Sequence, residues 1–196
     1  MNKPTVDPSK RILMLHKPKE LVVTRPKSPD AKTVYSLLPP EFHAQGWVPV
    51  GRLDKDSTGL LLFVREGFLV RLLQTPKNID KVYEVWIKGR LRPEHLVKIL
   101  EGVPSALGLL KAKAIHILGV VGPNSLVKVV LDEGKNRHIR RMFSGLKDIE
   151  LKRFFKVRDL SRTSIGPIRL DLEPGQWRFL TADESEALLN CVVKKR

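Results

Sequence analysis

The sequence predicts an α+β fold with a mixed, largely antiparallel sheet and flanking helices. Its 196 residues fit one domain or two small lobes. Hydrophobic residues make up 42% and charged residues 29%, which is ordinary globular usage and allows a packed core. Strand and helix patterns interleave without the regular alternation of a doubly wound parallel sheet. We therefore expect one folded domain over residues 11–190, a flexible start at 1–10 and a basic tail at 191–196.

In the first half, apolar runs that stop at proline or at turn-forming residues indicate the elements. The short apolar run at residues 12–15 is typical of a buried strand, and GFLVRLLQTP has the spacing of an amphipathic helix. Strands are expected at residues 11–18, 47–53, 60–63 and 81–89, and helices at 30–40 (from Asp30 to the Pro39-Pro40 pair), 67–76 and 92–103.

The second half adds strand patterns and ends in a helix. TADESEALLN carries Thr181 at the expected cap and Glu184 three residues later, which is the spacing of a capping box. The segment GKNRHIRRMF is expected to form a basic helix. Strands are expected at residues 111–118, 125–133, 151–157 and 164–172.

The charge of the chain indicates a polyanionic partner. Lys and Arg number 36 against 21 Asp and Glu, a net charge of +15, and the pI is about 10.1. Such self-repulsion favours a protein that binds nucleic acid. The single cysteine, Cys191, excludes an internal disulfide and a multi-cysteine zinc site. No apolar run is long enough for a signal segment or a membrane span, so we expect a cytoplasmic protein without membrane contact.

The positive charge is concentrated between Lys135 and Arg162. This segment holds ten basic residues against three acidic ones, with three phenylalanines interleaved. A solvated helix face would also carry charge, but with the charge of the whole chain we expect phosphate contacts here.

A second feature is GRLDKDSTG at residues 51–59, a run of turn formers before an apolar strand. Asp54 in such a place often only caps a turn. Asp54, Asp56, Thr58 and Gly59 match the first positions of a calcium loop, but Arg65 stands where that loop needs a bidentate glutamate. The sequence therefore excludes a calcium loop.

Two catalytic readings of the same aspartate stay open. In an aspartyl phosphotransferase, Asp54 would be the nucleophile and Asp56 the acid, with Mg²⁺ held by further carboxylates, for which only Asp132 and Glu133 offer a compact pair. In the other reading, one carboxylate works without a metal among cations. A glycosidic hydrolase needs two carboxylates, but an isomerase that keeps the detached base and rejoins it activates no water. One acid surrounded by basic residues fits the isomerase.

Five ordered strings resemble the motifs of the RNA pseudouridine synthases of the small-subunit-type (RsuA-like) family. Any one string alone would be a weak signal, and together they span about residues 11–185. The strings are KPKELVVT (17–24), GRLDKDSTGLLLF (51–63), KVYEV (81–85), EGKNRHIRRMF (133–143) and SIGPIRLDLEPGQWRFLT (164–181).

The resemblance implies roles for individual residues. It implies that Asp54 is the essential catalytic residue, that Tyr83 packs against the target base and that Arg140 pairs with the catalytic carboxylate. It also implies that Arg52 contacts RNA and holds the target nucleotide out of its stack. Flipping the nucleotide costs a few kcal/mol, and stacking on an aromatic ring offsets about 1–3 kcal/mol per base. No cofactor is implied.

Other basic residues are expected to bind substrate. Arg141 follows Arg140, and on a helix adjacent side chains point about 100° apart, so only one of them can face Asp54. The motif position selects Arg140, which leaves Arg141 for RNA contact. Lys81 and Arg137 are expected to contact phosphates. The sequence further suggests that Ile165 shapes the wall of the pocket, and that the five histidines, which share no metal spacing, are structural or RNA-facing.

The sequence also departs from the family pattern. Glu20 stands where glycine is usual, so the first turn is expected to be shaped differently. The stretch from Met142 to Gly166 looks longer than the pattern, with two candidate L-x-R strings at residues 151 and 160. The separate RNA-binding module that often precedes the catalytic domain has no room before Arg11. The chain therefore resembles the short E-type synthases of the large ribosomal particle, which lack this module.

From these observations we expect catalysis in a basic cleft between two lobes. The expected reaction converts a specific uridine to pseudouridine in structured RNA, with 23S ribosomal RNA as the first candidate and transfer RNA as the second. The protein is expected to act as a monomer. A non-catalytic RNA-binding or ribosome assembly protein stays open as an alternative, and in that case Asp54 would be dispensable.

Overall fold

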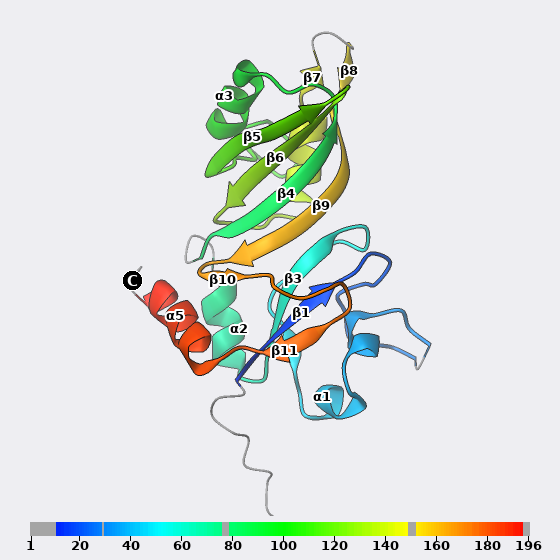
Figure 1. The fold of residues 1–196 in the computed structure, drawn as a ribbon, viewed down its shortest axis with the longest axis vertical. Coiled ribbons are helices and arrows are strands. Elements are labelled where there is room, and N and C mark those ends of the chain that lie inside the picture. The colour runs from blue at the N-terminus through cyan, green and yellow to red at the C-terminus, as the bar shows by residue number, and fades with distance from the viewer. Residues whose placement is uncertain (1–10, 29, 76–78, 149–151, 194–196) are drawn as a thin grey trace, which may run out of the picture. The chain divides into compact units, whose positions relative to one another are not determined.

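A computed structural model describes residues 11–28, 30–75, 79–148 and 152–193, although it gives no side-chain detail for residue 193. The chain divides into two compact units (Figure 1). Unit 1 combines residues 1–79 with 164–196, and unit 2 is residues 80–163. The predicted start at 1–10 lies outside the described residues, as do residues 194–196 of the predicted tail.

Unit 1 is built on a small antiparallel sheet. Its central strand β1 (Ile12–Lys17) pairs with β3 (Thr58–Val64) on one side and β11 (Trp177–Phe179) on the other. The two-residue strand β2 (Val48–Pro49) also pairs with β3. The other elements of the unit are the 3-10 helix η1 (Val34–Leu37), α1 (Pro40–Ala44), α2 (Gly67–Gln74), β10 (Ile168–Arg169) and α5 (Ala182–Val193).

Both faces of β1 and β3 are buried, which explains why these strands are continuous apolar runs. Ile12 and Met14 belong to a core cluster that includes Leu69 of α2 and Leu188 of α5. Residues that alternate with them face an aromatic group, in which the ring of Tyr35 meets that of Phe63 at 5.7 Å between centroids. Further ring contacts in this group join Phe42, Trp47, Trp177 and Phe179.

Unit 2 has an antiparallel sheet in which β6 (Asn124–Leu131) lies between β4 (Lys81–Lys88) and β5 (Ala114–Val121). On the other side of β4 lies β9 (Lys156–Ile165), whose last two residues belong to unit 1. Buried and exposed residues alternate along β4, as its sequence predicts. The remaining elements are α3 (Pro93–Glu101), α4 (His138–Ser144), β7 (Lys147–Asp148) and β8 (Arg153–Phe154).

The predicted α+β class with largely antiparallel pairing is confirmed, but several element bounds were wrong. The helix predicted over residues 30–40 is only the 3-10 turn η1, capped by Thr33, and Pro40 begins α1 instead of ending a helix. A proline fits the first turn of a helix because its missing N–H would have no partner there. The strand predicted at 47–53 is reduced to β2, and β11 was not predicted at all.

The predicted capping box of the last helix is confirmed. The backbone N–H of Glu184 donates to Thr181 Oγ1 at 3.1 Å, and the N–H of Thr181 donates to Glu184 Oε2 at 2.8 Å. The helix continues to Val193, three residues beyond its predicted end. Within the described part of the chain, no helix is long and apolar enough to cross a membrane.

Candidate active site

Asp54 lies in unit 1, in the loop that joins β2 to β3. Gly51 enters this loop with a φ of +76°, a conformation that favours glycine, and Arg52 after it is exposed. Asp54 is partly exposed, and its carbonyl accepts a hydrogen bond from the N–H of Ser57 at 3.0 Å. The loop is therefore a tight turn that places Asp54 shortly before the buried strand β3.

Lys17 binds the backbone of this loop through its ammonium group. It is the last residue of β1, and no part of it is exposed. Its Nζ donates hydrogen bonds to the carbonyl oxygens of Ser57 at 2.8 Å, Lys55 at 3.3 Å and Pro18 at 2.9 Å. An ammonium group has three donors, so these three bonds use its full capacity. Two of the three carbonyls belong to the loop that carries Asp54.

Burial also makes the charged form of Lys17 less favourable. Burial lowers the pKa of its ammonium group from the ordinary value of 10.5 to about 8, and the carboxylates of Asp56 and Asp54 act in the opposite direction. Lys17 thus places a positive charge beside the aspartates of the loop.

Glu20 joins the first turn of the chain to the same loop. Its N–H donates to the carbonyl of Lys55 at 2.9 Å, and its carboxylate lies 3.2 Å from Lys55 Nζ. The φ of Glu20 is +70°, in the left-handed region that favours glycine. The sequence suggested that glutamate at this position would change the turn. The glutamate therefore bears the strain of this backbone conformation, and a turn shaped differently from that of the family stays a prediction.

In unit 2, Tyr83 stands third in β4 and is 7% exposed. Arg162 of β9 is 3% exposed, and its guanidinium carbon lies 6.0 Å from the centroid of the Tyr83 ring. This is the outer limit for a cation–π contact. The neighbouring strands are joined here, because Thr163 Oγ1 donates to the carbonyl of Val82 at 3.4 Å. A buried guanidinium therefore lies over the ring that is predicted to meet the base.

Helix α4 carries the predicted Arg140 and Arg141, both partly exposed. Arg140 Nη1 donates to the carbonyl of Val157 at 3.3 Å, which ties the helix to β9. Arg137 caps the helix with a φ of +50° and is exposed, as phosphate contact would require. Lys81 is the first residue of β4 and is partly exposed.

His138 anchors the start of α4. Its side chain is 4% exposed, and its Nε2 lies 3.1 Å from the carbonyl of Lys111. Burial lowers the pKa of His138, which favours the neutral ring with its proton on Nε2. His95 is likewise buried and accepts from the N–H of Arg92 at 3.0 Å. These two histidines have structural contacts, as the sequence suggested.

The structure thus distributes the predicted residues over both units. Arg52, Asp54 and Ile165 belong to unit 1, whereas Tyr83 and Arg140 belong to unit 2. Ile165 is 3% exposed within the core cluster of unit 1. The pairing of Asp54 with Arg140 and the role of Ile165 in a pocket wall stay predictions.

Sequence reasoning assigned no role to Lys17 and none to Arg162. Lys17 closes a strand in which the other residues are almost all buried, and a proline follows it, so its burial could have been expected. Arg162 lies two residues after Leu160 in a strand, and alternation places both on one face. The L-x-R string at residue 160 ends at Arg162, but nothing in the sequence shows that Arg162 meets Tyr83.

With this geometry established, comparison with known proteins identifies the family. The family model described as RNA pseudouridylate synthase matches residues 11–145, and the chain belongs to this family. An uncharacterized RNA pseudouridine synthase of Aquifex aeolicus is 31% identical over 98% of this chain and 75% of its own length. The ribosomal large subunit pseudouridine synthase B of Haemophilus influenzae is 34% identical over 76% of this chain but only 41% of its own length.

A solved structure supports the same fold. A crystal structure of a pseudouridylate synthase superposes with a TM-score of 0.76 and is 29% identical, covering 91% of this chain and 73% of that one. The predicted pseudouridine synthase fold is therefore confirmed. The chain spans less than half of the Haemophilus protein, so the activity and partners of that longer protein are not carried over directly.

Proposed function

We propose that this protein isomerises a specific uridine to pseudouridine in structured RNA. The observation that carries the proposal is the Asp54 loop, which lies inside the matched family segment and is held by the buried Lys17. The ammonium group of Lys17 binds two carbonyls of this loop, those of Lys55 and Ser57. These bonds give the carboxylate of Asp54 a defined position. Such preorganisation is what a single catalytic acid requires.

The reaction has a simple atomic balance. The bond between N1 of uracil and C1′ of the ribose breaks, and a bond between C5 and C1′ forms. The hydrogen of C5 passes to solvent, and N1 gains a proton after the ring has turned. No oxidant, reductant or net water is consumed, so the balance calls for no second carboxylate to activate water and no cofactor. Asp54 acts either as nucleophile at C1′ or as base toward the 2′ hydrogen.

The other residues act around this carboxylate. Tyr83 stacks on the extruded uracil, and Arg162 keeps its ring in place. Arg140 supplies the guanidinium that pairs with Asp54. Arg52 contacts the RNA backbone beside the target nucleotide. The remaining substrate contacts come from Lys81, Arg137, Arg141 and Ile165.

Ribosomal RNA is the first candidate substrate. The Haemophilus relative is named for the large ribosomal subunit, and a Vibrio parahaemolyticus relative, 30% identical, is named for the small subunit. The net charge of +15 suits a structured polyanion. We further propose a monomer that works in the cytoplasm on 23S ribosomal RNA, in the manner of the short E-type synthases, with transfer RNA as the second candidate.

Mapping of pseudouridines tests the proposal. Ribosomal and transfer RNA are isolated from cells with and without the gene, and pseudouridines are located by chemical modification and sequencing. We expect one site, or a few neighbouring sites, in 23S ribosomal RNA to disappear without the gene and to return with the wild-type gene. If every pseudouridine persists, the proposal fails, and a non-catalytic role in RNA binding or ribosome assembly takes its place.

A further inference from the structure

An exposed aromatic residue lies among cations at one end of unit 2. Phe154 of β8 is 56% exposed, and Lys147 Nζ of the paired strand β7 lies 5.1 Å from the centroid of its ring. Phe155, next in the chain, is 1% exposed. Two adjacent phenylalanines therefore point to opposite sides, one into the core and one into solvent.

The described residues of β7 and β8 are firmly attached to the rest of unit 2. The buried Phe155 packs its ring against that of His95 at 5.0 Å between centroids, and its N–H donates to the carbonyl of Leu146. Asp148 is 2% exposed, and its Oδ2 accepts a hydrogen bond from the N–H of Arg90 at 2.9 Å. A Cβ on Gly89 would collide with the Phe155 ring, so the backbone of this turn approaches the hairpin closely. Phe154 is consequently held in place by its own chain.

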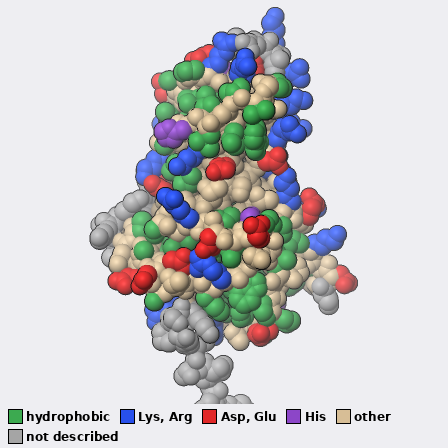
Figure 2. All heavy atoms as spheres, in the orientation of Figure 1, with side chains coloured by type: hydrophobic (Ala, Val, Ile, Leu, Met, Phe, Trp, Pro, Cys, Tyr) green, Lys and Arg blue, Asp and Glu red, His purple; other side chains and the backbone are tan. Residues whose placement is uncertain are grey.

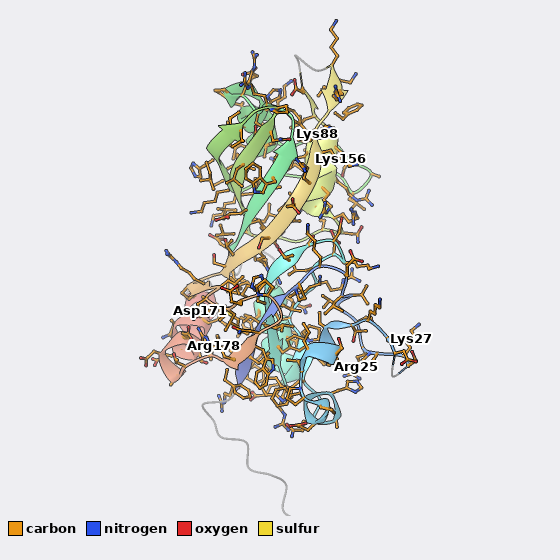
Figure 3. All side chains as sticks on the ribbon, turned by 45° about the vertical axis from the view of Figure 1, so that its right-hand side comes forward. Arg25, Lys27, Lys88, Lys156, Asp171 and Arg178 are labelled. Carbon is orange, nitrogen blue, oxygen red and sulfur yellow. The ribbon has the colours of Figure 1, made fainter. Side chains whose placement is uncertain are left out.

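Further exposed cations lie at this end of unit 2. Lys88 and Lys156 lie at the same end of the neighbouring strands β4 and β9 (Figure 3), and both are exposed. Figure 2 shows Lys and Arg side chains along the side of unit 2 where β7, β8 and β9 lie. The one acid that the structure describes in the hairpin, Asp148, is buried and adds no exposed negative charge. We call the exposed residues of this region the hairpin surface: Lys88, Arg90, Lys147, Arg153, Phe154 and Lys156.

Within unit 2, the hairpin surface lies away from Tyr83. Tyr83 and Lys88 are five residues apart in β4, which corresponds to about 17 Å of strand. The side chain of Tyr83 points into the buried face of the sheet, whereas that of Lys88 is on the exposed face. Along β4, the hairpin surface is therefore separate from Tyr83.

We propose that the hairpin surface binds an unpaired stretch of RNA outside the catalytic site, with a base stacked on Phe154 and phosphates held by the surrounding cations. The inference builds on the proposed function by supplying a second RNA contact. An exposed aromatic ring accepts any base through its π face, and lysines beside it neutralise the backbone. An acidic protein partner would also meet the cations. However, the exposed ring of Phe154 offers a stacking face to a base, which the carboxylates of an acidic protein would not use.

A uridine-free RNA separates this proposal from the proposed function. A fluorescein-labelled RNA of twelve adenosines (A12) contains no uridine that the enzyme could isomerise. Its binding therefore reports on RNA contacts outside the catalytic site. We expect Phe154→Ala to weaken A12 binding at least fivefold, because stacking contributes about 1–3 kcal/mol per base. Phe154→Trp should bind within twofold of wild type. Unchanged far-UV circular dichroism shows that the variants are folded.

A matched pair of charge variants tests the cations. The double variant Lys88→Gln/Lys156→Gln should reduce the slope of log K against log salt by about 1.4, since each phosphate contact on a single strand contributes about 0.7. The control Lys27→Gln/Lys98→Gln removes the same charge from exposed positions in unit 1 and on α3, and its slope should equal that of wild type.

Each outcome has a defined meaning. If Phe154→Ala binds A12 as tightly as wild type, or if both charge pairs change the slope equally, the hairpin surface is not an RNA site, even where wild type forms pseudouridine. If wild type forms no pseudouridine but the hairpin variants lose A12 binding as expected, the proposed function fails and the hairpin surface stands. Failure of wild type to bind A12 at all overturns the inference.

Discussion

At the scale of single residues, the least expected feature is a lysine with no exposed surface beside the proposed catalytic aspartate. Lys17 was part of a recognised string, but a sequence cannot show that its three donors meet three carbonyls. Asp54, in contrast, could be selected from the sequence, because its turn and the strand after it are encoded locally. The role of a residue was predictable where it depends on neighbours in the chain. It was not predictable where it depends on contacts across the fold.

Substitution of Lys17 by methionine should destabilise the protein and reduce activity. The buried carbonyl of Ser57 would lose its hydrogen bond from Lys17 Nζ, and leaving a buried polar group unsatisfied costs about 1–3 kcal/mol. The carbonyl of Lys55 would keep its hydrogen bond from the N–H of Glu20. The pKa of Lys17 is about 8 in the folded protein and has its ordinary value of 10.5 in the unfolded chain. Unfolding therefore takes up a proton between these pH values, and the stability of wild type relative to Lys17→Met should rise from pH 8 to 10.5. Urea unfolding of both proteins checks this, and a difference that stays constant with pH would contradict it.

Two substitutions of Tyr83 distinguish its ring from its hydroxyl. Tyr83→Phe keeps the aromatic face that the base would stack on, so we expect most of the activity to remain. Tyr83→Ala should lose about tenfold or more, consistent with 1–3 kcal/mol of stacking. Initial rates of pseudouridine formation at subsaturating RNA measure both variants. Equal losses would show that the hydroxyl carries the role.

At the scale of elements, an arginine of the sheet of unit 1 adds a polar contact to the apolar packing of α5. Arg178 of β11 donates from Nη1 and Nη2 to the two carboxylate oxygens of Glu184, both at 2.7 Å, and its Nη2 also donates to Asp171 Oδ2 at 2.7 Å. Figure 3 shows Arg178 and Asp171 close together. Glu184 also completes the capping box, so a residue placed by local sequence rules takes part in a long-range contact as well.

Arg178→Met should loosen this helix at neutral pH but not at low pH. The hydrogen bonds from Arg178 lower the pKa of Glu184 below its usual value of 4.5. The stabilisation they give is therefore present above pH 4.5 and is lost as the pH falls through the folded pKa. We expect wild type to exceed Arg178→Met by about 1 kcal/mol or more at pH 7 and by much less at pH 3. Thermal unfolding at both pH values measures the difference, and an equal difference at each would argue against the ion pair.

The elements themselves show where sequence patterns suffice. Strands β1, β3, β4 and β6 and helices α2 and α3 follow from apolar periodicity and proline positions, because their burial is regular. The pattern failed where few hydrogen bonds define an element. η1 and α1 replace one predicted helix, since Pro40 can begin a helix as well as end one. β11 is three residues long, and its pairing with the edge of β1 defines it as a strand.

At the scale of the whole molecule, the fold class, the basic charge and an organisation in two lobes could be predicted from the sequence, but the boundary between the two units could not. Strand β9 runs from unit 2 into unit 1 and appears in the sequence as two separate strand candidates. The boundary between Thr163 and Ser164 falls inside a continuous strand and carries no turn signal. A chain with a net charge of +15 should bind RNA with a strong dependence on salt, whatever the units contribute separately.

The central claim is that Asp54 breaks and remakes a bond between ribose and uracil. The most direct measurement is release of tritium to water from RNA made with uridine labelled at C5, because that hydrogen leaves only when C5 bonds to C1′. Wild type should release it in excess EDTA as well as in Mg²⁺, and Asp54→Asn should release none while binding RNA within a few fold of wild type. Tritium release by Asp54→Asn at close to the wild-type rate would contradict the account.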